Sequence, residues 1–285
     1  MSDNLKRDII FVSLFLLVLA NVFVWQFIFS LDGNLKVVFF DIGQGDSVFV
    51  ETPQGHQILI DGGPGQRVLT KLGKAMPFWD KTIDLVISTH PDYDHLSGLV
   101  SVLERYQVKN VLWNGGVVNN TVFTNWLKDL EIEKAQVFTA RSGQVIQAGQ
   151  ARFSVLYPLA DFAGQSVEKE SNNSSVVARL SYGSSDFLFT GDLPTKNEAE
   201  LLASNQNIAS EVLKVAHHGS KYSSSPEFLA MINPQLAIIS VGANNTYGHP
   251  NQEVLSNLAE FGITVKRTDQ VGDIKVVSNG KNLIY

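Results

Sequence analysis

Four side chains that can bind a metal ion lie within six consecutive positions, His90, Asp92, Asp94 and His95. They follow an apolar run at residues 84–88, which predicts a buried strand. Side chains of an extended segment alternate between two faces, so alternate residues of this motif can project together from the strand end. Imidazole nitrogens combined with carboxylate oxygens suit a divalent ion such as Zn²⁺ or Mn²⁺. This density of ligands favours a metal site over a solvated polar loop.

Acidic and histidine residues also end other apolar runs, each beside a glycine. Asp61 ends one run, Asp192 ends another, and the doublet His217-His218 ends a third. Such positions gather along one edge of packed sheets, where the sites of α/β proteins form. Taken singly, Asp192 reads as a helix N-cap, Asp61 as a turn residue and the doublet as a partly buried pair. Their combined placement favours a single site.

Strand patterns dominate the first half of the chain, and strands alternate with helices in the second. Short β-branched or aromatic runs predict strands at 36–40, 47–50 and 57–60. Farther on, a helix predicted at 252–261 stops at Gly262 and is one of several that separate short strands. This order indicates an α/β fold of two sheets with helices on their outer faces.

The N-terminal region is more apolar than the rest of the chain. Only three polar residues interrupt residues 9–29, and a helix of this length spans roughly 30 Å, the thickness of a bilayer core. No small-residue cleavage site follows, so we expect one uncleaved transmembrane anchor rather than a signal peptide or a buried helix. Lys6 and Arg7 precede the run and only Lys36 lies close behind it. This bias predicts a cytoplasmic N-terminus with the remaining chain outside the cell membrane.

We therefore expect four segments: a cytoplasmic N-terminus at 1–8, the anchor at 9–30, a linker at 31–34 and one domain at 35–285. The chain has no cysteine, which excludes disulfides and thiolate metal ligands. Its formal net charge of −6 argues against a protein that holds nucleic acid by bulk electrostatics.

The order of these motifs resembles the metallo-β-lactamase superfamily. His90-x-Asp92-x-Asp94-His95 is accompanied, at matching intervals, by the acidic residues and the histidine doublet described above. Four segments narrow the resemblance to the C-terminal hydrolase domain of ComEC-type DNA-uptake proteins. They are Phe40–Ser47, Leu59–Gly63, His217–Ser220 and Tyr247–Pro250. The resemblance covers about residues 35–285.

The resemblance implies a four-layer αββα sandwich with two divalent metal ions, Zn²⁺ or Mn²⁺, at one sheet edge. The implied ligands are His90, Asp92, Asp94, His95, Asp192 and one of His217 and His218. His90 and Asp92 would bind one ion. Asp94, His95 and one histidine of the doublet would bind the other, and Asp192 would bridge the two ions. Within the doublet we prefer His217, which is nearer the strand end. Asp61 would orient the site by hydrogen bonding.

Departures from the usual superfamily pattern support the ComEC-type branch. The superfamily usually has histidine in place of Asp92 and another histidine within the segment 171–175, and this branch shares both changes. An oxygen-richer site shifts the expected ion toward Mn²⁺ and weakens its retention. ComEC-type transporters carry many membrane spans before this domain, whereas one is expected here. We therefore expect any channel to be a separate membrane protein.

The implied chemistry is hydrolysis of a phosphodiester. Paired divalent ions lower the pKa of a shared water and stabilise charge on phosphate oxygens, and Asp94 would be central to this catalysis. His249 is a candidate general acid or phosphate contact, although it also suits packing of its Gly-His-Pro turn. Further candidate substrate contacts, which could equally form an ordinary polar loop, are Asn173, Lys221, Tyr222 and Ser223.

Three functions fit these observations. The leading hypothesis is a membrane-anchored, metal-dependent phosphodiesterase, a nuclease acting on DNA outside the cytoplasmic membrane. The second keeps the chemistry but acts on cell-wall or lipid headgroups, which the negative charge favours unless folding gathers a basic patch. The residues of that patch would be Lys214, Lys221, Lys266, Arg267 and Lys275. The third is a non-catalytic module with a degenerate metal site that binds DNA or a channel partner. β-Lactam or thioester hydrolysis fits less well, because the subfamily motifs point elsewhere.

Overall fold

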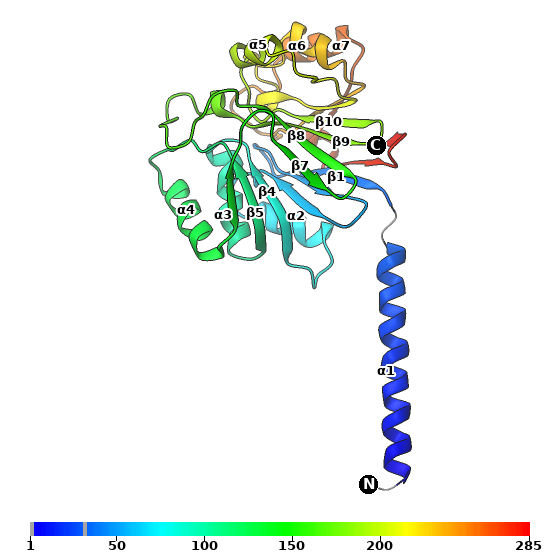
Figure 1. Cartoon of the computed structure of the whole chain (residues 1–285). Coiled ribbons are helices and arrows are strands. Elements are labelled where there is room, and N and C mark those ends of the chain that lie inside the picture. The colour runs from blue at the N-terminus through cyan, green and yellow to red at the C-terminus, as the bar shows by residue number, and fades with distance from the viewer. Residues whose placement is uncertain (1–2, 31–32) are drawn as a thin grey trace.

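The computed structural model of the protein describes residues 3–30 and 33–285, and two β-sheets pack face to face in this part of the chain. Helices cover the outer face of each sheet, so the sandwich has the layer order helix, sheet, sheet, helix (Figure 1). The predicted α/β sandwich of two sheets is therefore confirmed.

The first sheet contains eight strands within the described residues, and half of them form a parallel block. β3 to β6 run parallel, with Ile60 paired with Ile87 at the ends of β3 and β4. The order across the sheet is β15 (Leu283–Ile284), β14 (Ile274–Ser278), β1 (Leu35–Phe39), β2 (Val48–Glu51), β3 (Gln57–Ile60), β4 (Thr82–Ser88), β5 (Gln107–Trp113) and β6 (Gln136–Thr139).

The second sheet contains seven strands within the same described residues, again with a parallel block. β10 to β13 run parallel, and Phe189 at the end of β10 pairs with Lys214 at the end of β11. The order across the sheet is β13 (Thr264–Arg267), β12 (Leu236–Ile239), β11 (Val212–Lys214), β10 (Ser185–Phe189), β9 (Val177–Tyr182), β8 (Ala151–Tyr157) and β7 (Val145–Ala148).

Three hydrophobic clusters hold the layers together. The cluster between the sheets includes Phe39 and Phe187, because alternate side chains of each strand face the opposite sheet. Trp126 belongs to the cluster beneath the helices of the first sheet, and Phe228 to the one beneath the helices of the second. The helices over the first sheet are α2 (Arg67–Ala75), α3 (Tyr93–Leu103) and α4 (Thr121–Glu133), and those over the second are α5 (Thr195–Ala203), α6 (Pro226–Ile232) and α7 (Gln252–Glu260). Shorter helical turns are η1 (Ser171–Ser174), η2 (Ala216–Gly219) and α8 (Thr268–Val271).

The N-terminal helix α1 (Asp3–Ser30) stands away from the sandwich (Figure 1). Within residues 3–30 and 33–285, no helix combines the length and the apolar character that crossing a membrane requires. The transmembrane anchor predicted at 9–30 is therefore not supported. The linker predicted at 31–34 lies partly outside the described residues, and β1 begins at Leu35. The four-segment division stays a prediction.

Candidate metal centre

Four loops meet at one edge of the sandwich because each follows a strand of a parallel block. Asp61 follows β3, and the His90 motif follows β4, its parallel neighbour in the first sheet. Asp192 follows β10 and the histidine doublet follows β11, its parallel neighbour in the second sheet. Parallel strands present their carboxyl ends on the same side, so these loops converge. The structure brings together all the metal ligands that the sequence predicted.

The candidate ligand atoms lie close enough to share metal ions. His95 Nε2 lies 3.3 Å from Asp192 Oδ1, and His218 Nε2 lies 3.3 Å from Asp94 Oδ2 and 3.6 Å from Asp192 Oδ2. His90 Nε2 lies 3.6 Å from Asp92 Oδ2 and 3.9 Å from Asp192 Oδ2. In two sets, the ligand atoms all lie within 4.8 Å of one another. They are His90, His95 and Asp192, and Asp94, His95 and His218. Asp192 lies between the two ends of the cluster, as a bridging ligand would.

The unpaired polar atoms of this cluster show that the site fits cations. Within the described part of the chain, the Nε2 atoms of His90, His95 and His218 and Oδ1 of Asp192 are buried without a hydrogen-bond partner. Buried polar atoms normally find partners, because an unpaired one costs about 1–3 kcal/mol. Four such atoms facing one another are explained by divalent ions among them.

Asp61 orients two of these histidine rings from the side that faces away from the centre. It contacts His95 directly and His90 through Thr89. Its carboxylate accepts hydrogen bonds from Thr89 N at 2.8 Å and from Thr89 Oγ1 at 2.7 Å. His95 Nδ1 lies 2.9 Å from Asp61 Oδ2, and His90 Nδ1 lies 3.0 Å from Thr89 Oγ1. Since the Thr89 hydroxyl donates to Asp61, it accepts from His90. Both rings therefore carry their proton on Nδ1 and present Nε2 to the centre.

Geometry distinguishes the two histidines of the doublet and does not support the preference for His217. His218 is buried, with Nδ1 2.9 Å from Ser240 O and Nε2 facing the carboxylates. His217 is part-exposed, its Nε2 lies 3.8 Å from Asp192, and its Nδ1 lies 3.4 Å from Asn172 Nδ2. Both residues have left-handed backbone, with φ of 50° and 55°. This conformation ends the strand alternation, and the second ring rather than the first turns inward.

The carboxylates and histidines of the metal-free cluster stabilise one another's charged forms and so shift one another's pKa values. Burial raises the pKa of Asp192, but the surrounding histidines hold it well below its usual range. Burial lowers the pKa of His95, but Asp192 and Asp61 raise it well above its ordinary value. Burial lowers the pKa of His218, but Asp192 and Asp46 outweigh this effect and raise it to about 9. Metal binding displaces such protons, so protons and cations compete for this centre.

Some of the predicted substrate contacts lie near the centre, whereas the side chain of one is already engaged in hydrogen bonds within the protein. His249 is close, with its ring 5.7 Å from that of His217. Tyr222 is exposed beside the centre, and Lys221 Nζ lies 5.0 Å from its ring centroid. The side-chain amide of Asn173 donates a hydrogen bond to Glu170. Ser223 is buried, and its hydroxyl donates to the carbonyls of Ala216 and Ser220 at 2.9 Å. The substrate contact predicted for Ser223 is therefore wrong, because its hydroxyl is engaged within the loop.

Two residues beside the candidate ligands were not assigned to the centre from the sequence. Asp46 lies in the loop after β1, and its carboxylate reaches His218. Lys214 was expected in a surface patch, but it is buried and contacts Asp46. The Gly-Gln-Gly-Asp motif that contains Asp46 was the available signal. A single sequence gives no comparable signal for the burial of Lys214.

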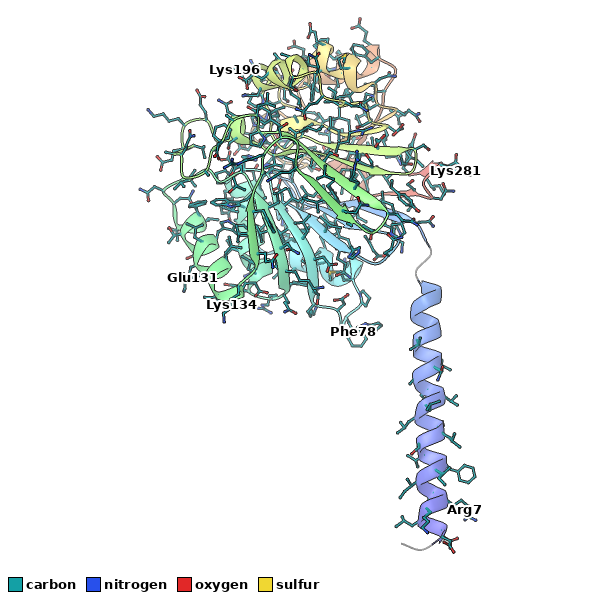
Figure 2. All side chains as sticks on the ribbon, in the orientation of Figure 1. Arg7, Phe78, Glu131, Lys134, Lys196 and Lys281 are labelled. Carbon is teal, nitrogen blue, oxygen red and sulfur yellow. The ribbon has the colours of Figure 1, made fainter. Side chains whose placement is uncertain are left out.

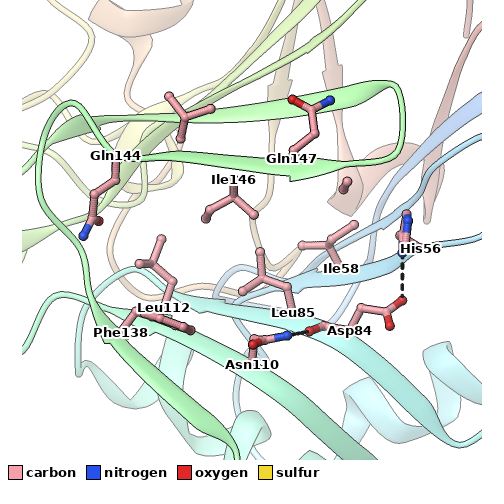
Figure 3. A pocket seen from close by; sticks show the side chains of 12 residues that line it. His56, Ile58, Asp84, Leu85, Asn110, Leu112, Phe138, Gln144, Ile146 and Gln147 are labelled. Atoms are coloured by element: carbon pink, nitrogen blue, oxygen red, sulfur yellow. Dashed lines mark hydrogen bonds and ion pairs between the residues drawn. The ribbon is translucent and has the colours of Figure 1, made fainter.

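Another cavity lies away from the centre. It measures about 600 Å³ and opens between the sheets at the β6 and β7 edge, lined by Ile58, Leu85 and Ile146 among others (Figure 3). His56 at its rim lies 3.7 Å from Asp84. Among the described residues that line it, none is a candidate metal ligand. His56 is thus separate from the centre.

Comparison with known proteins agrees with this geometry. The sequence pattern described as "Metallo-beta-lactamase superfamily" matches residues 40–112. The crystal structure of the metallo-beta-lactamase fold protein YhfI from Bacillus subtilis superposes with a TM-score of 0.57. That superposition covers 85% of this chain and 99% of YhfI at 12% sequence identity. Residues 40–112 therefore match the metallo-β-lactamase superfamily, and the chain has the metallo-β-lactamase fold.

Competence proteins are similar over most of the chain. ComE operon protein 3 of Bacillus subtilis (strain 168) is 34% identical over 86% of this chain and 33% of its own length. Competence protein ComA of Neisseria gonorrhoeae is 30% identical over 86% of this chain and 32% of its own length. The chain thus spans about a third of the length of these curated relatives. The chain is thus related in sequence to ComEC-type competence proteins and contains a metallo-β-lactamase domain.

Proposed function

We propose that this domain is a phosphodiesterase that uses two divalent ions, Zn²⁺ or Mn²⁺, and that its substrate is DNA. The observation that carries the proposal is the set of buried, unpaired Nε2 and carboxylate atoms that face one another at the sheet edge. Similarity to competence proteins supports DNA as the substrate.

Hollows on both sides of the centre support an extended substrate. The Asp92 hollow, of about 610 Å³, is lined by Asp92, Lys169, Glu170, Ser171, Asn172, Asn173, Lys196 and Tyr222. The Asp94 hollow, of about 440 Å³, is lined by Gln44, Pro64, Gly65, Arg67, Tyr93, Asp94 and Tyr247. Each hollow thus reaches one of the two carboxylates at opposite ends of the candidate ligand cluster. A chain that continues on both sides of the scissile phosphate would fill both.

The side chains of the two hollows suit a flexible nucleic acid strand. Tyr93, Tyr222 and Tyr247 are all exposed and offer faces on which bases can stack. Arg67 and Lys196 are exposed cations that can contact phosphates, and Figure 2 shows Lys196 on the outer surface. Glu170 and the candidate ligands give the same hollows negative charge, so attraction to phosphate is local rather than a broad basic surface.

The residues of the centre have defined parts in this proposal. His90, Asp92, Asp94, His95, Asp192 and His218 would hold the ions. When bound, such ions supply a water of lowered pKa and stabilise charge on the phosphate. Burial lowers the pKa of His249, and His217 and His218 lower it further. A neutral His249 suits a hydrogen bond to a phosphate oxygen or the leaving oxygen through its ring N–H.

Headgroup hydrolysis remains the second candidate because the expected basic patch is not formed by the described residues. Lys214 is buried against Asp46, and Arg267 pairs with Asp269 at 2.6 Å. Lys266 lies over the ring of Tyr285. With a net charge of −6, the protein has no wide basic surface built from those five cations.

An activity screen separates these functions. The protein is assayed with Mn²⁺ and with Zn²⁺ on linear and closed circular single-stranded DNA, duplex DNA, bis-p-nitrophenyl phosphate and a phospholipid headgroup ester. DNA cleavage that is lost in Asp94→Ala and in chelator supports the nuclease. Cleavage of the headgroup ester alone supports the second function. Binding of DNA without hydrolysis of any substrate contradicts both and supports a non-catalytic module.

The location and partner of the domain are part of the same proposal. We propose that it acts outside the cytoplasmic membrane, next to a separate membrane channel protein. Protease added to intact spheroplasts tests the location, since an extracytoplasmic domain is digested while a cytoplasmic control protein survives. Crosslinking in whole cells followed by isolation of this protein tests the partner.

A further inference from the structure

An ion pair is buried directly beside the candidate metal centre. Lys214, at the end of β11, is 2% exposed, and Asp46, in the loop between β1 and β2, is 3% exposed. Lys214 Nζ contacts Asp46 Oδ2. Burial of two charges is favourable only with good geometry and further polar contacts, so the pair is unusual enough to require an explanation.

Asp46 connects this pair to three candidate ligands. Its Oδ1 lies 3.3 Å from His218 Nδ1, which also faces Ser240 O at 2.9 Å. Its Oδ2 lies 3.9 Å from His95 Nδ1. Its backbone N–H donates to Asp94 O at 3.1 Å. The loop therefore touches the ligand cluster from the side opposite to the converging Nε2 atoms.

The contacts of His218 define which nitrogen faces the centre. Ser240 O accepts a hydrogen bond from Nδ1 at 2.9 Å, so Nδ1 carries a ring proton, and Asp46 Oδ1 lies 3.3 Å away as a nearby negative charge. Nε2 is then the nitrogen that faces the carboxylates of Asp94 and Asp192, and a bound ion would displace its proton. Removing the Asp46 charge would leave the ring held on this side by the Ser240 carbonyl alone.

The contact with Lys214 distinguishes Asp46 from the other carboxylates of the centre. Ligand atoms of Asp46, Asp192 and His218 lie within 4.8 Å of one another, as do those of Asp46, Asp61 and His95. Without a counter-charge, Asp46 would compete for the ion that His218 is placed to bind. The Lys214 ammonium occupies the cation position on Asp46 Oδ2.

We propose that Asp46 and Lys214 form a positioning pair that orients His218 toward the metal ions and keeps Asp46 out of the ligand set. This inference rests on the proposed metal-dependent function. The pair does not touch the substrate, so neither residue is catalytic. Its effect is on the affinity and coordination of the ion that His218 binds.

Metal titration tests the pair directly. Asp46→Asn removes the negative charge beside His218 Nδ1 and Lys214 Nζ, so affinity for one of two Mn²⁺ ions is expected to fall about 10- to 100-fold. The absorption bands of the Co²⁺-loaded protein also change, because they report the coordination of the ion. Asp186→Asn is the control, since Asp186 pairs with Arg179 at 2.6 Å at the other end of β10. It keeps both ions and the wild-type spectrum.

A double variant separates positioning from folding. Lys214→Met alone leaves a buried carboxylate unpaired and is expected to destabilise the fold, so it is combined with Asp46→Asn to remove both charges. The double variant is expected to fold, which circular dichroism checks, and to bind one ion as weakly as the Asp46→Asn variant does. Wild-type affinity and an unchanged Co²⁺ spectrum in both the single Asp46 variant and the double variant overturn the proposal. A wild-type protein that binds no divalent ion overturns both proposals, whereas one that binds two ions and cuts no DNA contradicts only the nuclease.

Discussion

Gly62 and Gly98 lie in direct backbone contact, where the loop after β3 meets helix α3. A Cβ atom added to Gly98 would lie 2.0 Å from Gly62 O, and one added to Gly62 would lie 2.4 Å from Leu99 N. Gly62 N donates to His95 O at 2.8 Å, and Gly98 N donates to Gly63 O at 2.8 Å. The absence of side chains at this contact lets Asp61 approach His95.

Gly98→Ala is expected to disturb both stability and the metal centre. The added methyl group meets backbone rather than a flexible side chain, so α3 must shift, at a cost of about 1–3 kcal/mol. Gly73→Ala in α2 is the matched control, because no described atom beyond its local chain lies within 4 Å of that Cβ. It should stabilise the protein by up to about 1 kcal/mol. Denaturant unfolding measures both changes, and equal stability of the two variants would contradict this packing.

The two histidines of the doublet should differ in metal binding. His218→Ala removes a buried nitrogen that faces Asp94 and Asp192, so the protein is expected to lose one of two bound ions. His217→Ala is expected to keep both ions, because its nitrogen is farther from the cluster and part-exposed. Metal content after dialysis distinguishes them. Loss of an ion in the His217 variant alone would reverse the assignment.

Thr89→Val tests the hydrogen bonds that orient His90 and His95. The change conserves shape but removes the hydroxyl that donates to Asp61 and accepts from His90. Loss of stability of about 1–3 kcal/mol is expected from the unpaired buried groups, with metal affinity lower by about tenfold or more. Thr124→Val, on the exposed side of α4, removes a hydroxyl that contacts only the helix carbonyl of Asn120. Calorimetric metal titration of both variants should show weakened binding in the first alone.

Acid should remove the stabilisation contributed by Asp84. Burial raises the pKa of Asp84, but Lys109 at 2.8 Å and the Gln57 N–H at 2.9 Å lower it below its ordinary value. A carboxyl whose pKa is lowered on folding stabilises the protein above its unfolded pKa of about 3.9, and this stabilisation is lost as the pH falls through the folded value. The Tm difference between wild type and Asp84→Asn should therefore be greatest above about pH 4 and shrink below it. A constant difference from pH 7 to pH 3 would show that ionisation of Asp84 does not matter.

The sequence predicted the parts of the centre that depend on strand ends. His90, Asp94 and Asp192 each follow an apolar run, and parallel pairing places such ends at one edge whatever the loops between them do. His218 could not be distinguished from His217, because two consecutive left-handed residues reverse the alternation that a strand would have. Burial of Lys214 was also out of reach, since it depends on a partner in a distant loop.

The candidate ligands come from both halves of the sandwich. His90 and His95 follow a strand of the first sheet, whereas Asp192 and His218 follow strands of the second. Ions held among them would fasten the two halves across their open edge, and their binding energy would add to the stability of the folded chain. Cells starved of the ion would then lose intact protein as well as activity, so that nutrient supply would govern abundance.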